Sequence, residues 1–533
     1  MFKAYDRVML DYLSKVMKAM EFPDKFIAWI MMLHEGSTTC FLLDFLTNPI
    51  KVLFSIRQGD PLSMILYIIY IEPLLLMINK LTKGLFVSTL VQKDEDYCDD
   101  LNFLSEFESD LLIIERTFVR FEAVSGALLS RSSKSKVMGL GSWKQKLNWP
   151  LPWLQVKEEL KIFGFQITPK YRQTIDRCWT TCFAGFHGVL MSWSSRQLDT
   201  LVQRVEVLRV FATSMLWYKA SALPLPVKFA KKFESAMFRF LWTGKLEKLK
   251  LDEIKNPSLS GGLNLPCIIT KADSLFLSQT CKLLAKPGNK QYNHVKYWLG
   301  LYVKEYFPEM AVGPHAEIIS PYFSNMKDLL VAGIVLGDVN AKNLRKTTAK
   351  SLYTSFSSTF PPPKVVYKYE VDWDMVWMRL QSPMLESKQR EVMFMIVHNI
   401  VPNRDRLCNK FHMVPDQNCT ECGVLHDNVH LFCECKLVRE AWFWVRQRLL
   451  GLFPNDHGNT SNFEFINLMF GSYLMDNEAI WMLGIWVELV WNIVICKKKS
   501  LKLETTRTEF SLKFVSHKNS NSPALGHIIG LDA

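Results

Sequence analysis

The chain has 533 residues, which at about 150 residues per domain predicts three or four folded units. Hydrophobic residues make up 49% and charged residues 22%, which excludes a disordered tail and a fibrous repeat. Lys and Arg number 64 against 52 for Asp and Glu, and the net charge of +12 favours a polyanionic partner, most simply nucleic acid. The charged, amphipathic start has no apolar signal core, and the 12 cysteines are too sparse for a disulfide scaffold. We therefore expect a nuclear or cytoplasmic protein that is not secreted.

The first 170 residues mix helical and strand patterns. A turn at Glu21–Asp24 separates two helical patterns, and the second carries five apolar residues on or near one face: Phe26, Ile27, Trp29, Ile30 and Leu33. Short apolar runs between Phe41 and Phe54, on either side of Thr47-Asn48-Pro49, predict a strand, a turn and a strand.

Asp60-Pro61 opens a long apolar run. Asp is a good N-cap and Pro fits the first helical position, so the run predicts a helix from Leu62 to about Ile78. From about residue 179 to 242 the pattern is mainly helical, with a break at Leu223–Pro226. Ser258–Gly262 predicts a turn, and Pro361–Pro363 predicts a linker.

Two adjacent carboxylates, Asp99 and Asp100, lead directly into the apolar, strand-like run Leu101–Leu104. A carboxylate pair at a hairpin tip is a natural hard-oxygen site for Mg²⁺. Taken alone, the same dipeptide is typical of a solvated turn. The surrounding sequence favours the metal site.

A glycine-containing stretch, Ile56-Arg57-Gln58-Gly59, precedes the long apolar helix. Glycine lets the backbone approach a ligand closely, and Arg57 could pair with a phosphate. Taken alone, the stretch also fits a capped helix start.

In this order, RQGDPLS followed by YCDD resembles the reverse transcriptase of non-LTR (LINE-type) retrotransposons. Lys3–Val8 resembles the KAFDRV stretch at that family's first catalytic strand. Further segments resemble later parts of the family: Phe22–Ile27, Val124–Gly126, Ser133–Ser135, Leu160–Gly164, Trp217-Tyr218, Phe240–Trp242 and Gly261–Leu263. The resemblance covers roughly residues 1 to 280 and resumes near 370.

The resemblance implies a site for two Mg²⁺ ions, with Asp99 as the bridging ligand and Asp100 as its supporting carboxylate. It places Tyr5 against the incoming sugar, Arg57, Gln58 and Gly59 around the nucleotide and template, and Lys134 near the triphosphate. The implied partners are an RNA template, a DNA primer and deoxynucleotide triphosphates.

The family's first catalytic Asp lies three residues before the Lys of KAF, and Lys3 is that Lys here. Asp6 lies three residues after Lys3, so it is a poor substitute. We therefore expect an N-terminally truncated enzyme that binds RNA and DNA without polymerising. The alternative is an active reverse transcriptase whose reading frame continues upstream of Met1.

Four soft ligands, spaced Cys419-x2-Cys422-x7-His430-x4-Cys435, suit a closed tetrahedral Zn²⁺ site. Cys433 is a rival for the fourth position, and the alternative is a group of buried free cysteines. Cys435 is favoured because the residues after it resemble the family's C-terminal zinc-binding module. The metal would be structural. Nearby cations are candidate nucleic-acid contacts or simply a solvated face: Lys388, Arg390, Arg404, Arg406 and Lys410.

Residues 479–496 contain one charged residue, Glu488, and are long enough for a membrane span. Glu488 and Asn492 would be costly in lipid, and a buried helix between domains fits equally well, so we expect no membrane. A membrane-anchored protein is therefore the weaker alternative.

The predicted fold class is α+β. We expect a truncated reverse transcriptase palm at 1–170, a helical thumb at 171–280, a helical connector at 281–365, a zinc-binding module at 366–450 and a helical tail at 451–533.

Overall fold

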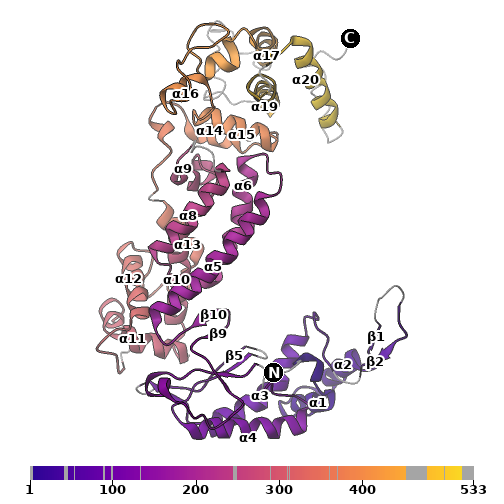
Figure 1. The fold of residues 1–533 in the computed structure, drawn as a ribbon, viewed down its shortest axis with the longest axis vertical. Helices are drawn as coiled ribbons and strands as arrows, with labels where there is room; N and C mark the ends of the chain where they lie inside the picture. The colour runs from indigo at the N-terminus through magenta and orange to yellow at the C-terminus, as the bar shows by residue number, and fades with distance from the viewer. Residues whose placement is uncertain are drawn as a thin grey trace. The chain divides into compact units, whose positions relative to one another are not determined.

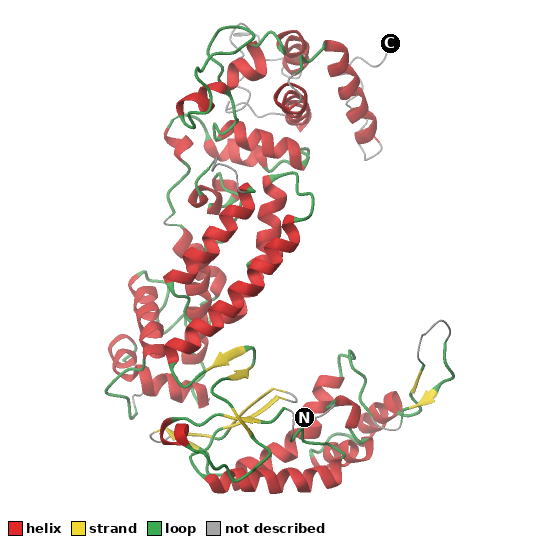
Figure 2. Cartoon of the chain, in the orientation of Figure 1, coloured by secondary structure: helices red, strands yellow, loops and turns green. Residues whose placement is uncertain are grey.

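The fold is taken from a computed structural model of the chain. The structure describes residues 4–40, 46–52, 55–87, 90–97, 100–131, 134–243, 249–288, 290–308, 310, 313–358, 360–368, 370–451, 477–496 and 499–518. The described residues are mostly helical, with a few short strands (Figure 2).

The chain divides into two compact units. The first contains Met1–Thr180 and Gln279–Lys346, and the second contains Thr181–Ser278 and Thr347–Ala533. Two long helices, α5 (Tyr171–Ser194) and α10 (Ile268–Leu284), run from one unit into the other. The five-part division expected from the sequence stays a prediction.

The first unit holds most of the strands and a helical core. Its other helices are α1 (Leu10–Ala19), α2 (Asp24–His34), α3 (Ser63–Leu81), α4 (Glu108–Ser125), α11 (Lys290–Tyr306) and α12 (Pro321–Val335), with the 3-10 turns η1 (Tyr5–Arg7) and η2 (Gly141–Gln145). Helix α3 packs on α1 and α4. Tyr67 and Tyr70 of α3 are fully buried in this core, and Tyr70 donates to Ser125 O over 2.8 Å.

The strands of the described chain form two-stranded pairs. The antiparallel pairs are β1 (Thr38–Thr39) with β2 (Ile50–Lys51), β3 (Leu85–Val87) with β4 (Leu90–Gln92), β5 (Asp94–Tyr97) with β6 (Asp100–Phe103), and β9 (Leu160–Ile162) with β10 (Phe165–Ile167). The pair β7 (Lys136–Val137) and β8 (Gln155–Val156) is parallel.

The second unit is helical in its described residues. Its other helices are α6 (Leu201–Val207), α7 (Ser214–Ala220), α8 (Val227–Trp242), α9 (Leu251–Lys255), α13 (Ala349–Ser357), α14 (Trp373–Leu380), α15 (Ser387–Val397), α16 (Arg404–Asn409), α17 (Arg439–Gly451), α19 (Asn477–Leu489) and α20 (Leu503–Lys518). Short 3-10 helices are η4 (Ser258–Ser260) and η5 (Lys364–Tyr367). Segments of π-helix are η3 (Leu208–Ala212), η6 (His430–Glu434) and η8 (Val490–Cys496). The predicted break at Leu223–Pro226 separates α7 from α8.

A glycine turn joins the helices around α8 to the C-terminal part of this unit. Gly261 has φ +81°, and a Cβ placed there would lie 2.6 Å from Cζ2 of Trp377. Its carbonyl oxygen lies 2.8 Å from Nε2 of His398, which stacks on Trp377 with ring centroids 5.5 Å apart. The turn expected at Ser258–Gly262 is therefore a close backbone approach to α14 and α15 that only glycine permits.

The apolar tail helix is part of this core. Most of α19 is buried, and the carboxylate of Glu488 accepts from Gln389 Nε2 over 3.0 Å and lies 3.5 Å from Lys513 Nζ. In the described part of the chain, Ser63–Leu81 and Asn477–Cys496 are long and apolar enough to cross a membrane, with 33% and 67% of their apolar windows buried. The partners of Glu488 explain how a charge is tolerated in the second helix.

Some local expectations need correction. The helix predicted from Leu62 to about Ile78 is present as Ser63–Leu81, but Asp60 is not its N-cap, because Asp60 Oδ1 accepts from Leu62 N in the turn before the helix. Of the five apolar residues in α2, only Ile27 and Ile30 are buried, while Trp29 is 52% exposed. Strand β1 lies before Phe41, and residues 41–45 lie outside the described residues.

Candidate metal centre and carboxylate hairpin

The first two cysteines of the candidate metal centre lie on a tight turn. Asn418 and Leu425 form an antiparallel bridge, and Cys419 N donates to Val424 O over 2.7 Å. Gly423 closes the turn with φ +76°, and its N–H donates to Cys419 O. A residue with positive φ is needed where the chain reverses this sharply, so the glycine after Cys422 is part of the turn.

The other two ligands come from the π-helical segment η6 and the residue that follows it. Asp427 Oδ1 accepts from His430 N over 2.8 Å, and Cys435 N donates to His430 O over 2.7 Å. His430 is 3% exposed and Cys435 is 2% exposed. Both side chains therefore face the interior.

The four predicted ligands meet at one point. Their ligand atoms all lie within 4.8 Å of one another. In a tetrahedron with Zn–S bonds of about 2.3 Å, two sulfurs lie about 3.8 Å apart. The Sγ atom of Cys435 lies 3.9 Å from that of Cys419 and 3.8 Å from that of Cys422. Cys433 is buried but is not part of this group, so the geometry favours Cys435 as the fourth ligand.

The chemistry of the donor set fits Zn²⁺. Both ring nitrogens of His430 are buried without a hydrogen-bond partner, a cost that a metal bond to one of them would reduce. The Lys436 N–H donates to Cys422 Sγ over 3.4 Å and holds the pKa of that thiol below its usual value. Zinc bound by Cys419, Cys422, His430 and Cys435 would have no open position for a substrate, which is typical of a structural site.

Most of the cationic side chains near this centre form ion pairs or hydrogen bonds with other residues of the chain. Lys388 pairs with Glu391 at 2.8 Å, and Arg404 pairs with Asp416 at 3.0 Å. Arg390 donates to the carbonyl oxygens of Ser382 and Leu385, and Arg406 donates to Asn399 O. Lys410 is exposed, with its ammonium 5.6 Å from the ring centre of Phe411. These contacts favour structural roles for the first four, and nucleic-acid binding by any of the five stays a prediction.

The carboxylate motif lies on a hairpin. Strands β5 and β6 pair with Tyr97 opposite Asp100, which leaves residues 98 and 99 between the strands. Asp100 is exposed at the start of β6, whereas Asp99 lies outside the described residues. Only one of the two predicted Mg²⁺ ligands is thus described, and the magnesium site stays a prediction.

Strand β5 carries a second pair of carboxylates, Asp94 and Asp96. Asp96 Oδ1 accepts from Asn102 N over 2.9 Å, and Asp94 Oδ2 accepts from Asn79 Nδ2 over 2.8 Å. Burial, with the charges of Asp94 and Glu95 nearby, raises the pKa of Asp96 to about 7. No motif in the sequence marks Asp96, although alternation along a strand puts Asp94 and Asp96 on one face.

The predicted nucleotide-binding residues near the N-terminus come together. Ile56 N donates to Tyr5 O over 3.0 Å, and Gln58 Nε2 donates to Asp6 Oδ1 over 3.4 Å. Arg57 Nη2 donates to Leu33 O and to Ser37 Oγ, and Gly59 takes φ +88° with open space around it. The segment 4–8 therefore lies against the segment 55–58.

This cluster and the carboxylate hairpin share one core. The ring of Tyr5 lies 5.1 Å from that of Tyr67, and Leu101 and Phe103 of β6 pack against the same buried cluster. Lys134 is exposed, and no contact in the described part of the chain links it to this region. The proximity of Lys134 to a triphosphate stays a prediction.

Comparison with known proteins finds a distant relative. No protein-family model matches the chain. The chain is similar to the "Transposon TX1 uncharacterized 149 kDa protein" of Xenopus laevis, at 25% identity over 309 residues. The similarity covers 54% of this chain and 22% of that protein, so the chain spans about a fifth of the relative's length. This similarity supports a transposon-related origin, the coarser part of the expectation from the sequence.

Proposed function

We propose that this chain is a nucleic-acid-binding protein related to the reverse transcriptase of non-LTR retrotransposons. One observation carries the proposal. Three segments that resemble catalytic stretches of that family, widely separated in the sequence, meet on one core: the residues around Tyr5, the Arg57–Gly59 turn and the β5–β6 hairpin that carries Asp100. The similarity to a transposon protein supports the same origin.

The zinc centre would support binding rather than chemistry. The four ligands enclose the ion, so zinc would hold residues 419–435 folded beside α17. The net charge of +12 supplies the electrostatic part of the affinity for a polyanion. We expect micromolar binding with little sequence preference.

Fluorescence anisotropy with a labelled single-stranded RNA tests this proposal. The logarithm of the binding constant should fall with the logarithm of salt concentration, by about 0.7 for each phosphate neutralised. A flat salt dependence, or no binding at about 50 mM salt, would contradict the proposal. A matched duplex serves as the comparison ligand.

Polymerisation is the second candidate function, favoured by the exposed carboxylate of Asp100 at the hairpin. Because the magnesium site at this hairpin stays a prediction, binding without polymerisation is the function that we propose first. Primer extension on an RNA template with Mg²⁺ or Mn²⁺ separates the two, beside an Asp99→Ala, Asp100→Ala control. Incorporation clearly above that control would establish the enzymatic function and overturn our expectation.

A further inference from the structure

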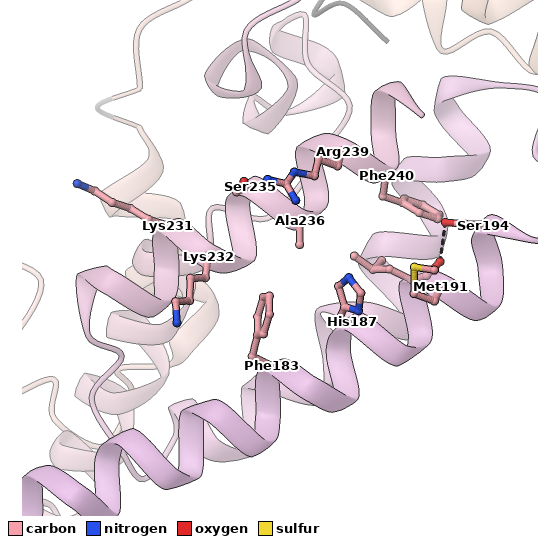
Figure 3. Close-up of a pocket in the computed structure, with 11 residues that line it drawn as sticks. Phe183, His187, Met191, Ser194, Lys231, Lys232, Ser235, Ala236, Arg239 and Phe240 are labelled. Atoms are coloured by element: carbon pink, nitrogen blue, oxygen red, sulfur yellow. Dashed lines mark hydrogen bonds between the residues drawn. The ribbon is translucent and has the colours of Figure 1, made fainter. Parts of the chain in front are cut away.

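A groove runs between α5 and α8 in the second unit. These helices lie side by side (Figure 1), and a cavity of about 650 Å³ opens between them. Its main lining residues are Phe183, His187 and Met191 of α5 with Lys231, Lys232 and Arg239 of α8. We call this the α5–α8 groove. Figure 3 shows Phe183 and His187 rising from α5 toward α8, with Lys231 and Lys232 at one end.

Buried aromatic side chains pack beneath the groove. Phe186 of α5 and Phe233 of α8 are fully buried, with ring centroids 5.0 Å apart and almost perpendicular planes. Phe183 packs against Phe233 at 5.4 Å, and the ring of His187 lies 6.1 Å from that of Phe183. His187 is exposed, so its ring is available to a ligand.

The rim of the groove is cationic. Lys231, Lys232 and Arg239 are exposed and form no salt bridge with any described residue. Lys232 and Arg239 are seven residues apart, about 10 Å along the helix. None of the described lining residues is acidic. These cations contrast with Arg390 and Arg406 near the zinc centre, whose guanidinium groups bond to carbonyl oxygens.

The groove continues past Arg239. A neighbouring cavity of about 300 Å³ shares Arg239 and Phe240 and extends to Trp193 and Arg196. The guanidinium of Arg196 lies 4.3 Å from the ring centre of Trp193, which also contacts Phe211 at 4.8 Å. Aromatic and cationic side chains therefore line both cavities.

From this pattern we propose that the α5–α8 groove binds single-stranded nucleic acid, with phosphates on Lys232 and Arg239 and an unpaired base stacked on His187. The inference rests on the proposed nucleic-acid binding and assigns it a site. Cations that neutralise the backbone, interleaved with aromatic faces, are how proteins hold single strands without reading sequence. The bases of a duplex are already stacked, so a duplex would use the cations but not His187.

The experiment uses the full chain and a fluorescein-labelled 12-nucleotide oligo(U), with a matched RNA duplex as the second ligand. Two variants probe the groove: Lys232→Gln with Arg239→Gln, and His187→Ala. The control is Lys282→Gln with Lys286→Gln, which removes the same charge from exposed positions outside the groove. Polyglutamate serves as competitor to test for an acidic protein ligand.

Lys232→Gln with Arg239→Gln should weaken binding of oligo(U). It should also lower by about 1.4 the slope of the logarithm of the binding constant against the logarithm of salt concentration, since each phosphate contact contributes about 0.7. The control should change neither clearly. His187→Ala should weaken oligo(U) binding at least about fivefold, from the loss of one stacked base, and leave duplex binding unchanged. Photocrosslinking of wild-type protein to 4-thiouridine RNA should label peptides from α5 or α8, a result that does not depend on how the variants fold.

The failures are distinguishable. Wild-type protein that binds no RNA would remove the proposed function itself. If the wild-type protein binds RNA but the groove variants bind as well as the control variant does, the groove proposal alone would be overturned. Crosslinks found only outside α5 and α8 would have the same consequence. If His187→Ala weakened binding of oligo(U) and of the duplex equally, the assignment to single strands would be overturned. If polyglutamate displaced RNA at equal charge, the assignment to nucleic acid would be overturned in favour of an acidic protein ligand.

Discussion

The glycine turn at 258–262 allows a sharp test of how the second unit is held together. In Gly261→Ala the new methyl would lie 2.6 Å from Trp377 Cζ2 and 2.8 Å from Pro363 Cγ. Trp377 is 2% exposed and lies between Trp373 and His398, with ring centroids 5.0 and 5.5 Å away, so the indole has no space to shift. We expect a loss of about 1–2 kcal/mol from the positive φ and about 1–3 kcal/mol from overpacking, or about 2–5 kcal/mol in all.

Urea unfolding followed by tryptophan fluorescence measures this loss as a lower midpoint at an unchanged m value. Gly423→Ala is the matched control in the same unit, because Gly423 has φ +76° and no atom within 4 Å of a new Cβ. With zinc in excess, the control should lose only the backbone contribution, about 1–2 kcal/mol. Equal losses in the two variants would show that the approach to Trp377 is not tight and would refute the reasoning.

Three further outcomes are expected. Metal analysis of the purified chain should find about one Zn²⁺, lost in Cys419→Ala with Cys422→Ala and kept in Cys408→Ser; equal zinc in the first variant would contradict the site. Burial lowers the pKa of His398 from 6.5 to about 4. The unfolded chain therefore binds a proton more readily, and the free energy of unfolding should fall by about 3 kcal/mol as the pH falls from 6.5 toward 4. The charged group facing the ring is Glu253, whose Oε2 lies 3.9 Å from His398 Nδ1. In His398→Gln, the free energy of unfolding should depend less steeply on pH across this range. Burial raises the pKa of Asp96 above its value in the unfolded chain, so ionisation of this carboxyl opposes folding increasingly as the pH rises from 3.8 toward 7. Asp96→Asn should therefore raise the melting temperature more at pH 8 than at pH 5. The reverse order would contradict the assignment.

Features set by local sequence were predicted well. The spacing of Cys419, Cys422, His430 and Cys435 is a local pattern, and the four ligand atoms meet. The break at Leu223–Pro226 follows from proline chemistry, and the structure has it between α7 and α8. The hairpin before Leu101 is also present. In each case the residues that decide the structure are neighbours in the chain.

Features set by tertiary contacts were missed. The guanidinium of Arg390 bonds to Ser382 O and Leu385 O, partners that no spacing reveals, and nucleic-acid binding by Arg390 stays a prediction. Trp29 has the periodicity of a buried face yet is 52% exposed, because periodicity does not say which neighbours a helix has. The α5–α8 groove needs two helices separated by more than 30 residues, so no motif marks it.

The zinc centre should stabilise more than its own turn, because contacts connect it step by step to the helices of the groove. Trp486 Nε1 of α19 donates to Phe432 O in η6, α19 packs on α15, and Glu391 of α15 accepts from Leu201 N at the start of α6. Helix α6 in turn packs on α8. We therefore expect zinc removal by a chelator to lower amide-exchange protection in α8 as well as in residues 403–438, while α4 in the first unit keeps its protection. Loss confined to 403–438 would show that this segment unfolds alone, and that the hydrogen bonds at Phe432 and Glu391 transmit no stability to the groove.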